Sequence, residues 1–145
     1  MEVDVQSNMS RPFGVYVLMI FVLLQGLSGL AGGAGLVLDP TGESLQIPLN
    51  WLDDSPFNNF LIPGLILLIV LGLFPLVVLY GLWCKSSWSW FGALIVGAAL
   101  IIWIAVEILV IGYHPQPPLQ LIYGCAGLII LILVLLSSVR DYTKK

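Results

Sequence analysis

The chain has 145 residues, with eight acidic side chains against five lysines and arginines, which gives a formal net charge of −3. Hydrophobic residues make up 59% of it and charged residues 9%, whereas a soluble globular domain usually has about 25% charged residues. This composition excludes an ordinary water-soluble domain, and the few cations form no basic patch of the kind that binds nucleic acid.

Four apolar blocks follow one another along the chain, and each approaches or exceeds the roughly 20 residues that a helix needs to span hydrocarbon. They cover residues 13–38, 60–83, 90–111 and 119–139. Helices are favoured over strands because the apolar runs do not alternate with polar residues, and because a helix satisfies its own backbone groups inside lipid. We predict an all-α fold, with residues 1–145 forming one transmembrane domain, an integral membrane four-helix bundle.

The first block carries small and polar residues spaced as on one face of a helix. They are Gln25, Ser28, Gly29, Gly32 and Gly33. Small residues let helix backbones approach closely, and an amide within hydrocarbon needs a hydrogen-bond partner. This helix-packing face can contact the other helices of the same chain or a second molecule. Contact within the chain is favoured because the chain must pack internally before it associates. The small residues 92–93 and 97–99 of the third block could supply the matching surface.

The first block could also be a cleaved signal peptide, since small residues follow at 31–34. The segment before it is acidic, however, and the apolar stretch is longer than the usual core of 7–15 residues. We therefore expect a retained helix.

The longest connection, residues 39–59, is acidic and begins with turn chemistry at 39–42. We expect it at the outer interface of the membrane. Ser55 followed by a proline resembles a helix start, with Ser55 as the N-cap. Within the second block Pro75 removes an amide donor beside Gly72, which predicts a kink there.

The cations all fall on one side of a four-span topology. They are Arg11 before the first block, Lys85 between the second and third, and Arg140, Lys144 and Lys145 after the fourth. The other side receives the acidic connection 39–59 and the short connection before residue 119, and neither contains a lysine or arginine. By the positive-inside rule both termini lie in the cytoplasm, and we predict a multi-pass plasma-membrane protein, N-in and C-in.

Glu107 is the one carboxylate within a spanning block, and an ionisable group at such depth is a functional-site hypothesis by default. Tyr123 on the fourth block stands at a similar depth, and His114 lies seven residues after Glu107. These three residues form a candidate proton or cation site. The structural alternative has Glu107 hydrogen-bonding to a neighbouring helix or reaching water at the interface, and it is favoured because no second carboxylate completes a relay.

Metal-binding, cofactor-binding and nucleophile motifs are missing from the sequence. We predict no cofactor, no metal and no enzymatic activity. The leading hypothesis is a non-enzymatic accessory or helix-packing component whose partners are the lipid bilayer and either itself or another membrane protein, but no nucleic acid. The alternative is a small oligomeric transporter or channel that uses Glu107, and a membrane enzyme comes third.

The segment 55–67, which reads Ser-Pro-Phe-Asn-Asn-Phe-Leu-Ile-Pro-Gly-Leu-Ile-Leu, is followed by Gly72, Pro75 and the pair Leu82-Trp83. This pattern resembles a family of small prokaryotic four-span membrane proteins of unknown function. The resemblance implies a bacterial or archaeal plasma-membrane protein and transfers no activity. A looser likeness to DoxX-like four-helix proteins rests on helix number and on the glycine-rich first helix.

Overall fold

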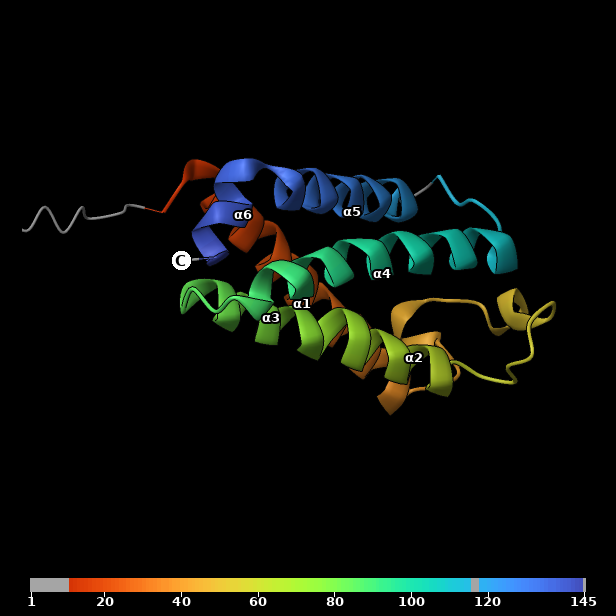
Figure 1. Ribbon diagram of the computed structural model, residues 1–145. Coiled ribbons are helices and arrows are strands. Elements are labelled where there is room, and N and C mark those ends of the chain that lie inside the picture. The colour runs from red at the N-terminus through yellow and green to blue at the C-terminus, as the bar shows by residue number, and fades with distance from the viewer. Residues whose placement is uncertain (1–10, 116–117, 145) are drawn as a thin grey trace, which may run out of the picture.

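A computed structural model describes residues 11–115 and 118–144, and every regular element in them is a helix (Figure 1). Three helices are long and apolar enough to cross a membrane: α1 (Phe13–Leu38), the composite helix Leu61–Trp83 and α4 (Trp88–Ile111). A fourth span is possible if the bent pair α5–α6 is counted as one. The all-α prediction and the membrane-compatible character of the helices are therefore confirmed.

The composite helix contains a π-helical turn in its middle. α2 (Leu61–Leu68) leads through η3 (Ile69–Leu73) into α3 (Phe74–Trp83). An α-helix would pair the carbonyl of Leu71 with the amide of residue 75, but that residue is Pro75 and has no amide. At the position of the kink predicted beside Gly72, the structure has this wider π-helical turn, and the two halves stay in one helix.

The fourth predicted span, 119–139, is wrong in its last part. α5 (Leu119–Leu135) is followed by Leu136, whose backbone is extended with ψ 133°, and then by α6 (Ser137–Lys144), which turns away by 64°. The sequence of α6 is polar except on one face, so it cannot continue into hydrocarbon and instead buries Val139 and Tyr142 across the end of the bundle.

The connection between α1 and α2 folds into two short 3₁₀ helices, η1 (Glu43–Leu45) and η2 (Leu49–Leu52). The predicted N-cap at Ser55 is wrong, because the helix starts only at Leu61, whose amide donates to Asn59 Oδ1 at 3.0 Å. The loop closes on a small apolar cluster that covers the ends of α1 and α2. Its buried members are Leu36, Leu52 and Phe60.

Asp39 organises the start of this loop. Its carboxylate accepts hydrogen bonds from the Thr41 hydroxyl at 2.6 Å and from the Ser44 amide at 2.9 Å. These bonds, the Thr41 hydroxyl first, hold the pKa of Asp39 below its ordinary value. Gly42 follows with φ +80°, a conformation that favours glycine. The turn predicted at 39–42 is therefore present.

The interior is filled by apolar side chains along the length of the bundle. The largest cluster joins α1, α3, α4, α5 and α6, and its fully buried members include Leu18, Val22, Val78, Leu82, Val96, Ile130 and Val134. A second cluster, around Leu71, Leu100 and Ile104, continues it toward the loop. Large apolar side chains also cover the outside, such as Leu109 at 84% exposed and Ile132 at 61%. Such an outer surface fits lipid rather than water.

The described lysines and arginines belong to segments at one end of the bundle, together with Asp141 of α6, whereas the carboxylates of loop 39–60 belong to the other end (Figure 1). At one end lie the start of α1, the α3–α4 connection and α6, which carry the described cations Arg11, Lys85, Arg140 and Lys144. We call this the cationic end. The opposite end holds the loop 39–60 with its four carboxylates, and we call it the acidic end.

Candidate functional site

The helix-packing face of α1 lies against the composite helix of the same chain. A Cβ atom built on Gly29 would stand 2.0 Å from the carbonyl oxygen of Leu71, and one built on Gly33 would stand 2.5 Å from the amide nitrogen of Leu68. Both distances are far below van der Waals contact, so only glycine permits this approach of two backbones. We call the contact of Gln25, Gly29 and Gly33 with residues 68–72 the glycine seam.

Gln25 gives the glycine seam its one interhelical hydrogen bond from a side chain. Its Nε2 donates to the carbonyl oxygen of Leu71 at 3.2 Å, across 46 residues of sequence. This is the carbonyl that Pro75 leaves without its α-helical donor, so Gln25 replaces the missing amide. The residue is 4% exposed, and its Oε1 atom is buried without a partner among the described residues.

The other two residues of the predicted face lie outside these close contacts. The Ser28 hydroxyl donates to the Leu24 carbonyl of its own helix, and a Cβ on Gly32 would meet only the Leu67 side chain, at 3.2 Å. The expectation that the small residues of the third block face this seam is wrong. Gly92 packs on Val78 of α3 and Gly97 on Leu131 of α5, because α4 lies between those helices.

A second polar group lies near the acidic end, where α4 ends and α5 begins. Gln120, in the first turn of α5, is 4% exposed and uses its whole side-chain amide. Its Nε2 donates to Glu107 Oε1 at 3.3 Å and to the Gly112 carbonyl at 3.1 Å, while its Oε1 accepts from the His114 amide at 2.8 Å. Glu107, half-buried on α4, is therefore linked through the neutral amide of Gln120 to the connection between α4 and α5.

His114 ties this polar group to the α1–α2 loop. Its ring stacks on Trp51 of η2, with ring centroids 4.2 Å apart and an angle of 17° between the planes. Its Nε2 lies 2.8 Å from the carbonyl oxygen of Ile111, and because a carbonyl only accepts, Nε2 carries the proton in this arrangement. The contact brings loop 39–60 against the end of α4.

The three predicted site residues are thus only partly brought together. Glu107 and His114 share Gln120, whereas Tyr123 packs against the apolar cluster of Leu71 and Leu100. Sequence reasoning missed Gln120 and Trp51. An uncharged glutamine beside an apolar span was the available signal for the first, since a buried amide must find partners.

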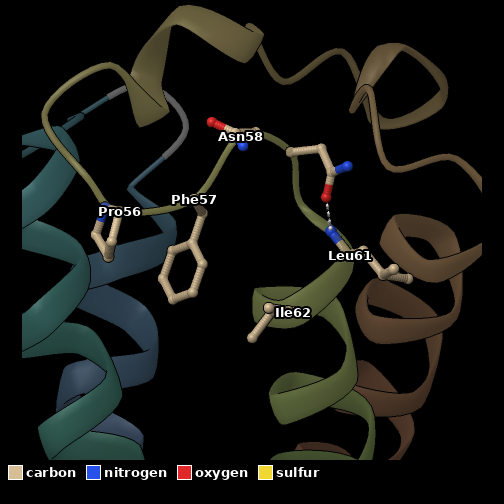
Figure 2. A pocket seen from close by; sticks show the side chains of 6 residues that line it. Pro56, Phe57, Asn58, Leu61 and Ile62 are labelled. Carbon is tan, nitrogen blue, oxygen red and sulfur yellow. Dashed lines mark hydrogen bonds between the residues drawn. The ribbon is translucent and has the colours of Figure 1, made fainter.

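A hollow of about 300 Å³ opens beside the start of α2 (Figure 2). Its lining consists of Pro56, Phe57, Asn58, Asn59, Leu61 and Ile62. It is lined by the loop and the first turn of α2, and neither Glu107 nor His114 borders it. Among the described residues, no group of three or more His, Cys, Asp or Glu side chains could hold a metal ion.

Comparison with known proteins adds no further assignment. No family model, no curated protein and no solved structure matches this chain. The resemblance to small prokaryotic four-span proteins, and the looser one to DoxX-like proteins, therefore stay predictions.

Proposed function

We propose that this chain is a non-enzymatic integral protein of the plasma membrane, with four spans and both termini in the cytoplasm, which acts as an accessory component by contacting itself or another membrane protein. The observation that carries the proposal is that the interior of the bundle is filled by contacts between helices. The described helices meet through apolar clusters and the glycine seam, and the two buried glutamines, Gln25 and Gln120, each donate a hydrogen bond to another helix.

The bent fourth helix is compatible with four spans. α5 has 17 residues, which at about 1.5 Å rise per residue is close to the lower limit for crossing hydrocarbon. α6 then lies at the interface, as expected of a short helix with one apolar and one polar face. The gathering of the described cations at one end supports a cytoplasmic location for that end through the positive-inside rule.

The rival proposal is an oligomeric transporter or channel. Its support is Glu107, a half-buried carboxylate of α4 that accepts a hydrogen bond from Gln120. The bonds of Gln120 favour a structural role for this group, because Gln120 also donates to the carbonyl of Gly112 and accepts from the His114 amide. These bonds satisfy the end of α4, which any helix end requires.

Two measurements separate these proposals. If the chain associates with itself, energy transfer between donor-labelled and acceptor-labelled copies in liposomes should persist when more lipid is added. Proteoliposomes should show no more proton or cation flux than empty vesicles, and Glu107→Gln should leave that flux unchanged. Flux that depends on Glu107 would overturn the accessory proposal in favour of transport.

Orientation needs its own test. Cysteine-free protein with Asp53→Cys or Ser138→Cys, in sealed vesicles, should react with a membrane-impermeant maleimide from opposite sides. Reaction of both positions from one side would show that the four-span topology is wrong.

A further inference from the structure

The end of the bundle opposite the acidic loop gathers two cations around one aromatic side chain. Tyr142 of α6 is 5% exposed and packs in the main apolar cluster. Arg11 Nε donates to its hydroxyl at 2.8 Å, and Lys85 Nζ lies 5.0 Å from the centre of its ring. Arg11 also donates from Nη2 to the Trp83 carbonyl at 2.9 Å and lies over the Trp83 ring. We call these four residues the tyrosine latch.

The tyrosine latch has two positive charges and no negative one among its four residues, and Asp141, the described carboxylate of α6, is exposed. The polar groups that act on the pKa of Arg11 are Tyr142 first and then Tyr16, which together hold it above its ordinary value, and no carboxylate is among them. Arg11 stays protonated. Among the residues that the structure describes, the neutral groups Tyr142, Trp83 and Tyr16 are the polar neighbours of Arg11, and the Lys85 ammonium group donates to no acceptor. Two like charges beside one ring repel each other unless an anion lies between or above them.

The surroundings of the tyrosine latch match the headgroup level of a bilayer. Tyr80 is 69% exposed, Trp83 57% and Trp88 46%, and all three lie at the same ends of α3 and α4. Tyrosine and tryptophan prefer this level because their rings are partly apolar and partly polar. An anion available at that depth is the phosphate of a lipid headgroup, which Arg and Lys bind by charge-assisted hydrogen bonds.

The geometry points to a binding site for the phosphate of an anionic phospholipid, formed by Arg11 and Lys85 on the scaffold of Tyr142 and Trp83. The exposed apolar residues of α3 beneath it, such as Val77, would lie along the acyl chains. The inference rests on the membrane placement proposed above. It goes beyond that proposal because it names a lipid class and the residues that select it.

The test compares two double variants with the same loss of charge. Arg11→Gln with Lys85→Gln removes the two cations of the tyrosine latch. Arg140→Gln with Lys144→Gln removes two exposed cations of α6, which stand one turn apart on a face that residue 142, two positions from Arg140, does not share. Full-length protein in neutral detergent is titrated with phosphatidylglycerol or phosphatidylcholine of matched acyl chains, and bound lipid is counted by native mass spectrometry.

The wild-type protein should retain phosphatidylglycerol over phosphatidylcholine. Because one cation near an anionic headgroup is worth about fivefold in affinity, the latch variant should lose roughly twenty-five-fold of this preference. The α6 variant should stay within about threefold of wild type, because Arg140 and Lys144 are exposed and, among the described residues, make no hydrogen bond or ring contact with the tyrosine latch. Lys85→Gln alone, which breaks no hydrogen bond among the described residues, provides a readout if the double variant does not fold.

Several outcomes would overturn the inference. Equal losses in the two double variants would show diffuse attraction instead of a site. Equal retention of both lipids by the wild type would show no headgroup selection. Inorganic phosphate that competes as well as the lipid would identify a free anion as the ligand. A chain that stays soluble without detergent would contradict the membrane placement itself, whereas a detergent-soluble chain without lipid preference contradicts only this inference.

Discussion

The glycine seam and the tyrosine latch both use a polar side chain to reach a backbone carbonyl of another helix, yet the two carbonyls differ in their other bonds. Gln25 reaches the carbonyl of Leu71, which has lost its α-helical donor to Pro75. Tyr142 reaches the carbonyl of Leu82, at 3.2 Å, which also accepts the backbone amide of Lys85 at 3.3 Å. The value of such a bond therefore depends on whether the carbonyl keeps another partner.

The glycine seam and the tyrosine latch also differ in how tightly they are packed. At Gly29 and Gly33 of the glycine seam the two backbones meet with no side chain between them, so no flexible group there can move aside. The tyrosine latch is formed by long side chains at the edge of the bundle, where Trp83 is exposed and water can replace a lost bond. We expect substitutions in the seam to cost more than those in the latch.

The largest effect is expected from Gly29→Ala. The added methyl group would stand on the Leu71 carbonyl, so the two helices must separate, which should cost about 3 kcal/mol. The measurement is unfolding by dodecyl sulfate from mixed micelles.

Gly124→Ala provides the matched control for this substitution. A Cβ there meets only Ile104 Cγ2, at 3.8 Å, so the variant should be neutral or more stable by up to about 1 kcal/mol. Equal stability of the two variants would show that α1 and the composite helix are not in direct backbone contact.

A smaller effect is expected from Gln25→Met, which keeps the length of the side chain and removes its amide. Loss of the bond to Leu71 should destabilise the chain by about 1 kcal/mol, within the range of side-chain hydrogen bonds between membrane helices. The same substitution in a Pro75→Ala background should cost less, because the restored amide of residue 75 can then bond the Leu71 carbonyl. A cost that is identical in both backgrounds would mean that Gln25 does not compensate for the proline.

The smallest effect is expected from Tyr142→Phe. The ring stays in the apolar cluster, the Leu82 carbonyl keeps the Lys85 amide, and Arg11 can be hydrated, so the change should be about 0.5 kcal/mol or less. Tyr80→Phe, at an exposed position of α3, serves as the control and should leave the unfolding midpoint unchanged. A loss as large as that of Gln25→Met would remove the distinction between seam and latch.

The amino-acid sequence by itself determined where the long helices lie. The bounds 13–38 agree with α1, and the third helix begins two residues before the predicted 90. The length and apolarity of a span are properties of contiguous residues, so they need no knowledge of tertiary contacts. For the same reason Pro75 beside Gly72 predicted a kink in the second helix, because the missing amide is a local fact, and the π-helical turn lies at that position.

Only the tertiary structure decided which polar groups meet. Arg11 and Tyr142 are separated by 131 residues, Gln25 and Leu71 by 46, and the bridge of Gln120 between Glu107 and His114 depends on how α5 is placed against α4. Hydropathy also did not predict the break at Leu136, since α6 turns there because its one apolar face packs against the end of the bundle. Hydrogen bonds of this kind depend on distances between elements, and a linear sequence does not contain those distances.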